Sequence, residues 1–342
     1  KTFVYKIFDS DNDNNPDLLW TFNSKQCIHG VIIAPFKNQT NSLELFSTKT
    51  WNDDNDKFSI INNNGTIYRE ILIDGSNDQF EGVSSMAAIS DIDNDGNLEI
   101  VVGYNNGLYV YKKGYSSYEL HWSYQNVDFP YMAAPIVLAD LDGDNDQEII
   151  FMVMKENFAR ICAKHHDGSF VSGWHFTDNK NITIDNSINN SHTYTQTPYL
   201  SVGDIDGDGY PEVVIGSNGY LYAWSKNGNI IQGFPVSIEG LNMAGRSPLI
   251  ADVDGNNDLE IICASLNNYI YAYHKDGSKV IGFPIPCEEV STPCISDVDC
   301  DGKNEIVAAG NRTLHIWDTD GDSRKIEWGH IRFNERNTGA YT

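Results

Sequence analysis

The sequence has few basic residues and no long apolar run. It holds 23 lysines and arginines against 48 aspartates and glutamates, which gives a formal net charge of −25. This excess of negative charge argues against binding to nucleic acid or to anionic membrane surfaces. No apolar run approaches the roughly 18 residues that a membrane-spanning helix needs, and the chain does not begin with a signal peptide. We therefore expect no membrane insertion, and a mature or excised form of the protein.

The common catalytic and zinc-binding signatures are also missing. There is no G-x-S-x-G, no H-E-x-x-H, no phosphate-binding loop and no GxGxxG that opens a helix. The six cysteines show no CxxC and no zinc spacing, although Cys287, Cys294 and Cys300 are close enough in sequence for one local disulfide. No stretch shows a convincing helical period. These absences favour a β-rich binding or structural protein over an enzyme.

What the chain does have is one acidic frame of nine residues, present five times. The clearest copy is "GDIDGDGYPEVVIG", residues 203–216, in which four acids precede an apolar run. The five copies begin at positions 91, 140, 204, 252 and 297, with acids at frame positions one, three and nine. Position six is always glycine or asparagine, the residues that best tolerate a left-handed backbone, so each loop is expected to turn sharply there. A solvated charge run would not keep one frame five times.

The frame has the ligand chemistry of a calcium loop. It offers oxygen ligands alone, and the turn leaves the carbonyl of position seven free to join them, a layout similar to the EF-hand loop. The EF-hand itself is not expected, because its bidentate glutamate stands at position twelve and helices flank it. Magnesium fits less well, because it demands near-ideal octahedral geometry. The alternative is a set of acidic turns that hold no ion.

We therefore expect about five Ca²⁺ ions. The predicted ligands, with the position-seven residue acting through its carbonyl, are Asp91, Asp93, Asp95, Asn97 and Glu99; Asp140, Asp142, Asp144, Asp146 and Glu148; Asp204, Asp206, Asp208, Tyr210 and Glu212; Asp252, Asp254, Asn256, Asp258 and Glu260; and Asp297, Asp299, Asp301, Lys303 and Glu305.

Two other segments match the frame less well. The frame at 36–44 keeps Glu44 at position nine but has Phe36, Asn38 and Thr40 where acids belong, so we expect it to hold no ion. A weaker metal site near the N-terminus has these acids in frame: Asp9, Asp11, Asp13 and Asp17. Alternatively, "FVYKIF" and "DLLWTF" pair as the last two strands of a blade, since too few residues follow for a whole blade.

The repeats predict an all-β fold. The five frames start 45 to 64 residues apart, and four short runs rich in valine, isoleucine and tyrosine follow in order within each repeat. Such a period and pattern are typical of a β-propeller. We expect one domain over residues 1–342, with repeat frames near 36, 91, 140, 204, 252 and 297. We favour seven four-stranded blades, with 1–23 and 330–342 closing the ring; six blades or a fragment of a longer chain are the alternatives. Alternating aromatics such as Tyr220, Tyr222 and Trp224 are expected to pack between blades.

These motifs resemble a known family. The D-x-D-x-D-G-x-x-E frame, with "GLYVYKKG", "GYLYAWSKNG" and "GFPV" after it, is similar to the FG-GAP or VCBS repeats of integrin α-subunit propellers and of secreted bacterial propellers. The final "IEWGHIRFNERNTGAY" resembles the terminus of bacterial surface propellers. The resemblance covers nearly the whole chain and implies calcium loops that hold the hairpins rigid while ligands bind elsewhere, often on the opposite face or between blades. Asn256 replaces an aspartate of the family pattern, so we expect lower calcium affinity there.

The resemblance favours a non-catalytic binding or adhesion module for a protein or glycan. We expect it outside the cell or on its surface, because weak calcium loops fill only at extracellular calcium levels. The long polar segment 177–199 is the candidate ligand site, through His192, Tyr194 and Tyr199.

Two alternatives follow from the same sequence. The first is a polysaccharide lyase on a calcium propeller, with these residues as candidates for action on a uronic acid: His165, His166, His175, His192, Arg160 and Arg246. The second is a purely structural module of a larger surface assembly.

Overall fold

The computed structural model describes residues 2–6, 17–22, 31–36, 44–49, 57–72, 87–104, 107–115, 117–129, 131–155, 158–175, 181–183, 198–238, 246–330 and 340–341. Within these ranges the chain forms strands and turns and no helix, so the described part contains no helix able to cross a membrane. The all-β prediction is confirmed.

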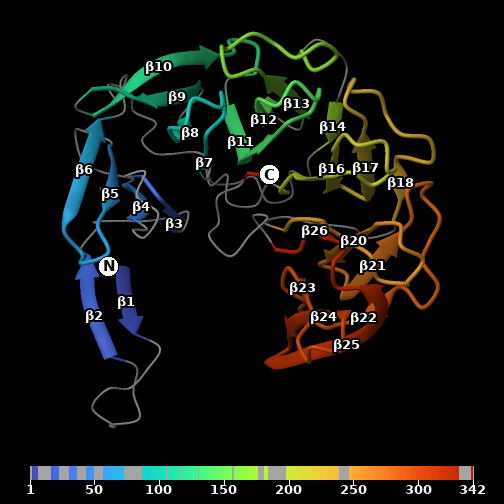
Figure 1. Ribbon diagram of the computed structural model, residues 1–342. Coiled ribbons are helices and arrows are strands. Elements are labelled where there is room, and N and C mark those ends of the chain that lie inside the picture. The colour runs from blue at the N-terminus through green and yellow to red at the C-terminus, as the bar shows by residue number, and fades with distance from the viewer. Residues whose placement is uncertain are drawn as a thin grey trace.

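The strands follow one another in short antiparallel meanders (Figure 1). The N-terminal hairpin is β1 (Thr2–Lys6) and β2 (Asp17–Phe22). The first three four-stranded sheets are β3 (Val31–Ala34), β4 (Glu44–Lys49), β5 (Lys57–Ile61), β6 (Ile67–Leu72); β7 (Ala88–Ser90), β8 (Glu99–Tyr104), β9 (Gly107–Lys113), β10 (Tyr118–Gln125); and β11 (Tyr131–Ala139), β12 (Glu148–Lys155), β13 (Phe158–Lys164), β14 (Asn181–Thr183). The next sheets are β15 (Ser201–Gly203), β16 (Glu212–Ser217), β17 (Tyr220–Trp224), β18 (Val236–Ser237); and β19 (Leu249–Ala251), β20 (Glu260–Ser265), β21 (Tyr269–Tyr273), β22 (Ile285–Pro286), which β26 (Ile326–Trp328) joins as a fifth strand beside β19. A three-stranded sheet follows: β23 (Cys294–Ser296), β24 (Lys303–Gly310), β25 (Thr313–Asp322).

Each sheet from β3 onward is a blade, and the blades stand side by side around a centre (Figure 1). The first strands of neighbouring blades contact one another, β7 with β11, β11 with β15, β15 with β19 and β19 with β23, so they form the inner ring. The second strands β16 and β20 are buried at every position. This explains why the residues between their terminal glutamate and serine are all apolar, because a blade between two others is covered on both faces.

The C-terminal segment returns to the inner ring. β26 pairs with β19, and Ala340 forms a parallel bridge with Leu138 of β11. Trp328 is buried, and its Nε1 donates a hydrogen bond to the hydroxyl of Ser247 at 3.2 Å. In Figure 1 the C-terminus accordingly lies between the blades.

The N-terminal hairpin stands apart. β1 pairs with β2, from Thr2 opposite Phe22 to Lys6 opposite Asp17, as the pairing of "FVYKIF" with "DLLWTF" predicts. In Figure 1 this hairpin extends away from the blades. Closure of the ring by residues 1–23 and 330–342, and the number of blades, stay predictions.

The cysteines that the structure describes form no disulfide bond with one another. Cys162, Cys263 and Cys287 are buried, and Cys294 and Cys300 are not bonded to each other or to Cys287. The local disulfide that the spacing allows is therefore not formed.

Candidate metal centre in five acidic loops

The five acidic frames occupy the same place in five consecutive blades. Each frame begins between the first and second strands of its blade and ends on the second strand; the loops are named here loop 91 (91–99), loop 140 (140–148), loop 204 (204–212), loop 252 (252–260) and loop 297 (297–305). Neighbouring loops touch, because the N–H of Gln147 donates to the carbonyl of Ile92 at 2.9 Å and Tyr210 lies against Gly143. The acidic loops therefore share one end of the propeller.

One pattern of hydrogen bonds shapes the loops. In loop 204, Asp204 accepts bonds from the N–H groups of Gly207 at 2.8 Å and Gly209 at 3.0 Å. The position-nine glutamate always accepts a bond through Oε2 from the N–H of position two, as Glu212 does from Ile205 at 3.0 Å. These bonds fix the first and last carboxylates of each frame against the loop backbone.

The predicted sharp turn is confirmed. Position six has φ between 72° and 91° in every loop, at Gly96, Asn145, Gly209, Asn257 and Gly302. Position four is also left-handed, with φ between 55° and 82°, at Asn94, Gly143, Gly207, Gly255 and Cys300. Four of these five residues are glycine or asparagine, which predicts a second turn at position four. Cys300 does not fit this pattern, so the second turn was missed in the sequence.

The turns bring predicted ligands together. Carboxylate oxygens of Asp91, Asp93 and Glu99 lie within 4.8 Å of one another, and so do those of Asp140, Asp142 and Glu148. Two oxygens on opposite sides of one calcium ion lie about 4.6–5.2 Å apart at ordinary bond lengths. These two groups therefore have the size of a site for one cation.

The buried glutamates fit a positive ion. Glu99 is 1% exposed, and its Oε1 has no hydrogen-bond partner. Burial, with the nearby aspartates, raises the pKa of Glu99 to about 8, Glu148 to about 9, Glu212 to about 8 and Glu260 to about 7. A dication would offset this cost of burying carboxylates among like charges. The buried carboxylates of these loops thus favour a bound dication.

A further residue faces each loop from the third strand of the blade. In loop 297 the position-nine glutamate, Glu305, pairs with Asp318 of the third strand. In the other four loops, the residue after the glutamate pairs with a residue near the end of the third strand. One step further along each pair, these residues lie opposite the four glutamates: Lys112, His165, Ser225 and His274. Sequence reasoning missed this position as part of the site. The signal was present in the aligned strand ends "VYKKG", "CAKHHDG", "YAWSKNG" and "YAYHKDG".

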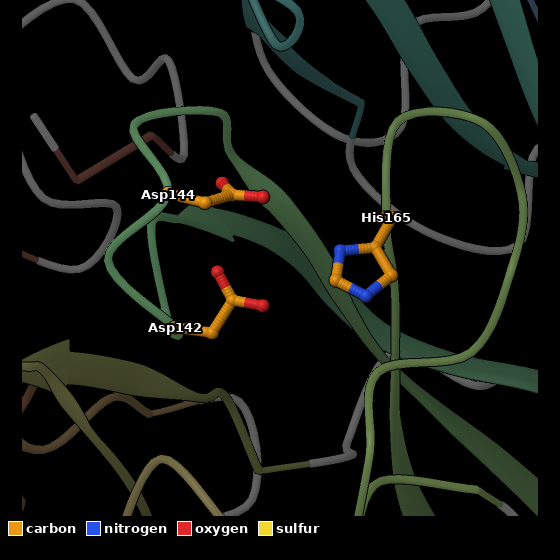
Figure 2. A group of neighbouring side chains, drawn as sticks. All are labelled: Asp142, Asp144 and His165. Atoms are coloured by element: carbon orange, nitrogen blue, oxygen red, sulfur yellow. The ribbon is translucent and has the colours of Figure 1, made fainter.

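The facing residue is basic in three of these blades. Lys112 Nζ contacts Asp93 and lies 3.0 Å from Oδ2 of Asp95. His165 Nδ1 lies 3.0 Å from Oε1 of Glu148, and His274 Nδ1 lies 3.2 Å from Oε1 of Glu260. Figure 2 shows the imidazole of His165 directed toward the carboxylates of loop 140.

The weaker frames contribute less. Phe36 is buried and packs against Phe46, with ring centroids 6.2 Å apart, so position one of the frame at 36–44 serves the core. Asp17 begins β2, while Asp9, Asp11 and Asp13 lie outside the described residues.

The proposed ligand residues of segment 177–199 are mostly outside the described part of the chain, which includes Tyr199 but neither His192 nor Tyr194. Tyr199 is partly buried, and its backbone N–H donates to the carbonyl of Arg246 at 2.8 Å.

The lyase candidates do not converge where the structure describes them. Arg246 donates to the carbonyl of Val290 at 2.6 Å, and the guanidinium of Arg160 lies 4.5 Å from the ring centre of Phe129. His175 packs on Phe170, and His165 and His166 face acids of loop 140. His165 and His166 therefore share the acids of loop 140, and the other candidates that the structure describes serve separate local contacts.

The opposite end of the propeller carries a row of exposed aromatic residues in the sense that they recur at the same position of three consecutive blades. The third strands of three consecutive blades begin with Phe158, Tyr220 and Tyr269, which are 51%, 41% and 40% exposed. The six residues of β16 separate this end from loop 204 by about 20 Å. The expectation that Tyr220 packs between blades is wrong, because it begins its strand at the surface; Trp224, at the other end, is buried and stacks on Tyr222.

Comparisons with known proteins agree with this architecture. A family model for the FG-GAP-like repeat matches residues 91–151 and 204–263, which hold four of the five loops. The solved Dos1 propeller is similar over 87% of this chain and 69% of its own, with a TM-score of 0.51 and 12% identity. A crystal structure of BBS1N in complex with ARL6DN is similar over 90% of this chain and 81% of that chain, with a TM-score of 0.50 and 12% identity. No curated protein matches significantly.

Proposed function

We propose that this chain, a β-propeller with FG-GAP-like repeats, is a calcium-stabilised binding module of the cell surface or extracellular space that performs no chemistry of its own. The observation that carries the proposal is the division of the molecule into two ends. One end holds the acidic loops, and the other holds the row of exposed aromatic residues.

The acidic end supplies rigidity. The ligands of each loop come from the turn and the start of the second strand, and Oε1 of Glu99 shows a buried acceptor still without a partner. A bound Ca²⁺ would supply positive charge there and tie the turn to the strand. Since binding to the folded state alone stabilises that state, each filled loop would add about 2.7 kcal/mol at a hundredfold excess of calcium over its Kd.

The aromatic end supplies the binding surface. Phe158, Tyr220 and Tyr269 begin equivalent strands, so rings of the same kind recur from blade to blade. Exposed tyrosine and phenylalanine provide large, stiff contact area for a protein partner or for stacking on sugar rings. In the BBS1N structure a propeller of this fold is in complex with ARL6DN, which supports a protein as one class of partner.

The test combines a glycan array with a screen of extracellular proteins, in calcium. The triple variant Phe158→Ser, Tyr220→Ser, Tyr269→Ser should lose any ligand of the wild type while remaining folded, with a modest fall in melting temperature because the rings are about half buried. Ile281→Ser, which changes a 98% exposed residue at the loop end, is the matched control and should bind normally. A ligand that survives the triple variant would refute the aromatic surface. A wild type that binds neither class would favour a structural module.

A further inference from the structure

Two of the five loops differ from the others in offering an imidazole nitrogen. The facing residue is His165 at loop 140 and His274 at loop 252, whereas loop 91 has Lys112, loop 204 has Ser225 and loop 297 has Asp318. The same residue type thus occupies the same structural position in two separate blades. This repetition concerns the third strand of the blade and is independent of the acidic frame itself.

Each imidazole meets the carboxylate oxygen that would face a cation. Oε2 of Glu148 and of Glu260 accepts a backbone N–H, while Oε1 lies 3.0 Å and 3.2 Å from the histidine Nδ1. In loop 91 the equivalent oxygen of Glu99, itself 1% exposed, has no hydrogen-bond partner. The two histidines therefore contact the glutamate oxygen, Oε1, whose equivalent in loop 91 is buried without a hydrogen-bond partner.

More than one carboxylate surrounds each ring. A ring nitrogen of His165 lies within 4.8 Å of oxygens from Asp142 and Asp144, and the three side chains face one another in Figure 2. His274 is held similarly, with Nε2 3.9 Å from Oδ2 of Asp254 and a cavity of about 290 Å³ beside it that opens the site to solvent. A histidine that served only as a hydrogen-bond donor would need the glutamate alone, whereas each of these rings also lies near aspartates of its loop.

The donor sets differ in which metal they suit. Calcium and magnesium take oxygen ligands, while imidazole together with carboxylates suits zinc and other late first-row dications. Two ligand atoms that share one tetrahedral zinc ion lie about 3.3–3.6 Å apart, given bonds of about 2.0–2.2 Å. The Nδ1 to Oε1 separations of 3.0 Å and 3.2 Å are slightly shorter than this, so a small outward shift of each side chain would admit the ion.

We propose that loops 140 and 252 are mixed nitrogen–oxygen sites that bind Zn²⁺ or a similar transition-metal dication in preference to Ca²⁺, with His165 and His274 as ligands. This goes beyond the calcium-stabilised binding module proposed above, since it makes the same propeller responsive to a second metal.

The test is a metal competition on the untagged protein saturated with millimolar calcium. Zinc is added, excess metal is removed, and bound zinc is counted by mass spectrometry; cobalt absorption reports nitrogen ligation independently. The wild type should retain two zinc ions per chain, His165→Ser or His274→Ser should retain one, and the double variant none. Serine is the matched replacement because loop 204 carries it naturally at Ser225.

A gain-of-function variant guards against a trivial loss through misfolding. Ser225→His should add one zinc ion at loop 204. If the double variant retains both zinc ions, or if calcium expels zinc from the wild type, the proposal is overturned. The zinc count is separate from the calcium count of the all-oxygen loops, so failure here leaves the calcium proposal untouched, and the reverse also holds.

Discussion

The carboxylate of Glu327 accepts a hydrogen bond from the backbone N–H of Asp204, with Oε2 2.6 Å from the nitrogen. The same oxygen accepts a bond from the hydroxyl of Tyr341 at 2.7 Å. Strand β26 and the C-terminal segment therefore hold the first acid of the middle loop from outside its own blade. The relationship couples the end of the chain to the shape of loop 204.

Removing this acceptor should destabilise the fold. Glu327→Ala leaves a partly buried N–H and a tyrosine hydroxyl without their partner, which costs about 1–3 kcal/mol of unfolding free energy in urea denaturation. Glu327→Gln keeps an acceptor oxygen and should cost less. An alanine variant as stable as the wild type would show that the C-terminal segment does not brace the loop.

Lys112 should weaken calcium binding at loop 91. Its ammonium group pairs with Asp93 and Asp95, so an incoming ion must displace it. Lys112→Ser is expected to raise the calcium affinity of this loop about fivefold, corresponding to about 1 kcal/mol for ion pairs open to solvent. Calorimetric titration measures the change, and Lys113→Ser is the control. Unchanged affinity in the Lys112 variant would contradict the competition.

Cys300 should be a strained residue. It has φ of 66° at frame position four, where the other loops have glycine or asparagine. A left-handed residue with a Cβ costs about 1–2 kcal/mol, and glycine costs about 0.5–1 kcal/mol in added chain entropy, so Cys300→Gly should stabilise the protein by about 0.5–1 kcal/mol. The reverse change, Gly207→Cys, has space for its Cβ and should destabilise by a similar amount. Equal denaturation midpoints would refute the strain.

Burial of Tyr124 should make stability fall at high pH. Desolvation raises the pKa of Tyr124 from 10.0 to about 12. The unfolded chain therefore loses the Tyr124 proton at a lower pH than the folded chain does. The contribution of the protonated, buried Tyr124 to the free energy of unfolding is complete below pH 10 and is lost as the pH rises toward 12. Tyr124→Phe should show a smaller loss of unfolding free energy between pH 10 and 12. Tyr115→Phe changes a fully exposed ring and should keep the wild-type profile.

The sequence predicted the blades and the left-handed turns because each depends on local pattern. Gly209 and Asn257 indicate a left-handed backbone conformation that few residues adopt, and the apolar run after Glu212 indicates a buried strand. It did not reveal His274, because that residue enters the loop through strand pairing, 14 positions after Glu260. The sequence did not predict the exposure of Tyr220. Alternation indicates which face of the sheet a side chain lies on, but it does not show that the first residue of the strand lies at the surface.

The central claim, that the acidic loops are calcium sites, is tested most directly by a calcium count on dialysed protein together with thermal unfolding in calcium and in chelator. With calcium alone supplied, we predict about five ions per chain and a marked fall in melting temperature on chelation. Asp206→Ala should remove one ion, whereas Asp276→Ala, an exposed acid outside the loops, should remove none. No bound calcium and no change in melting temperature would mean that the frames are acidic turns and that the calcium account is wrong.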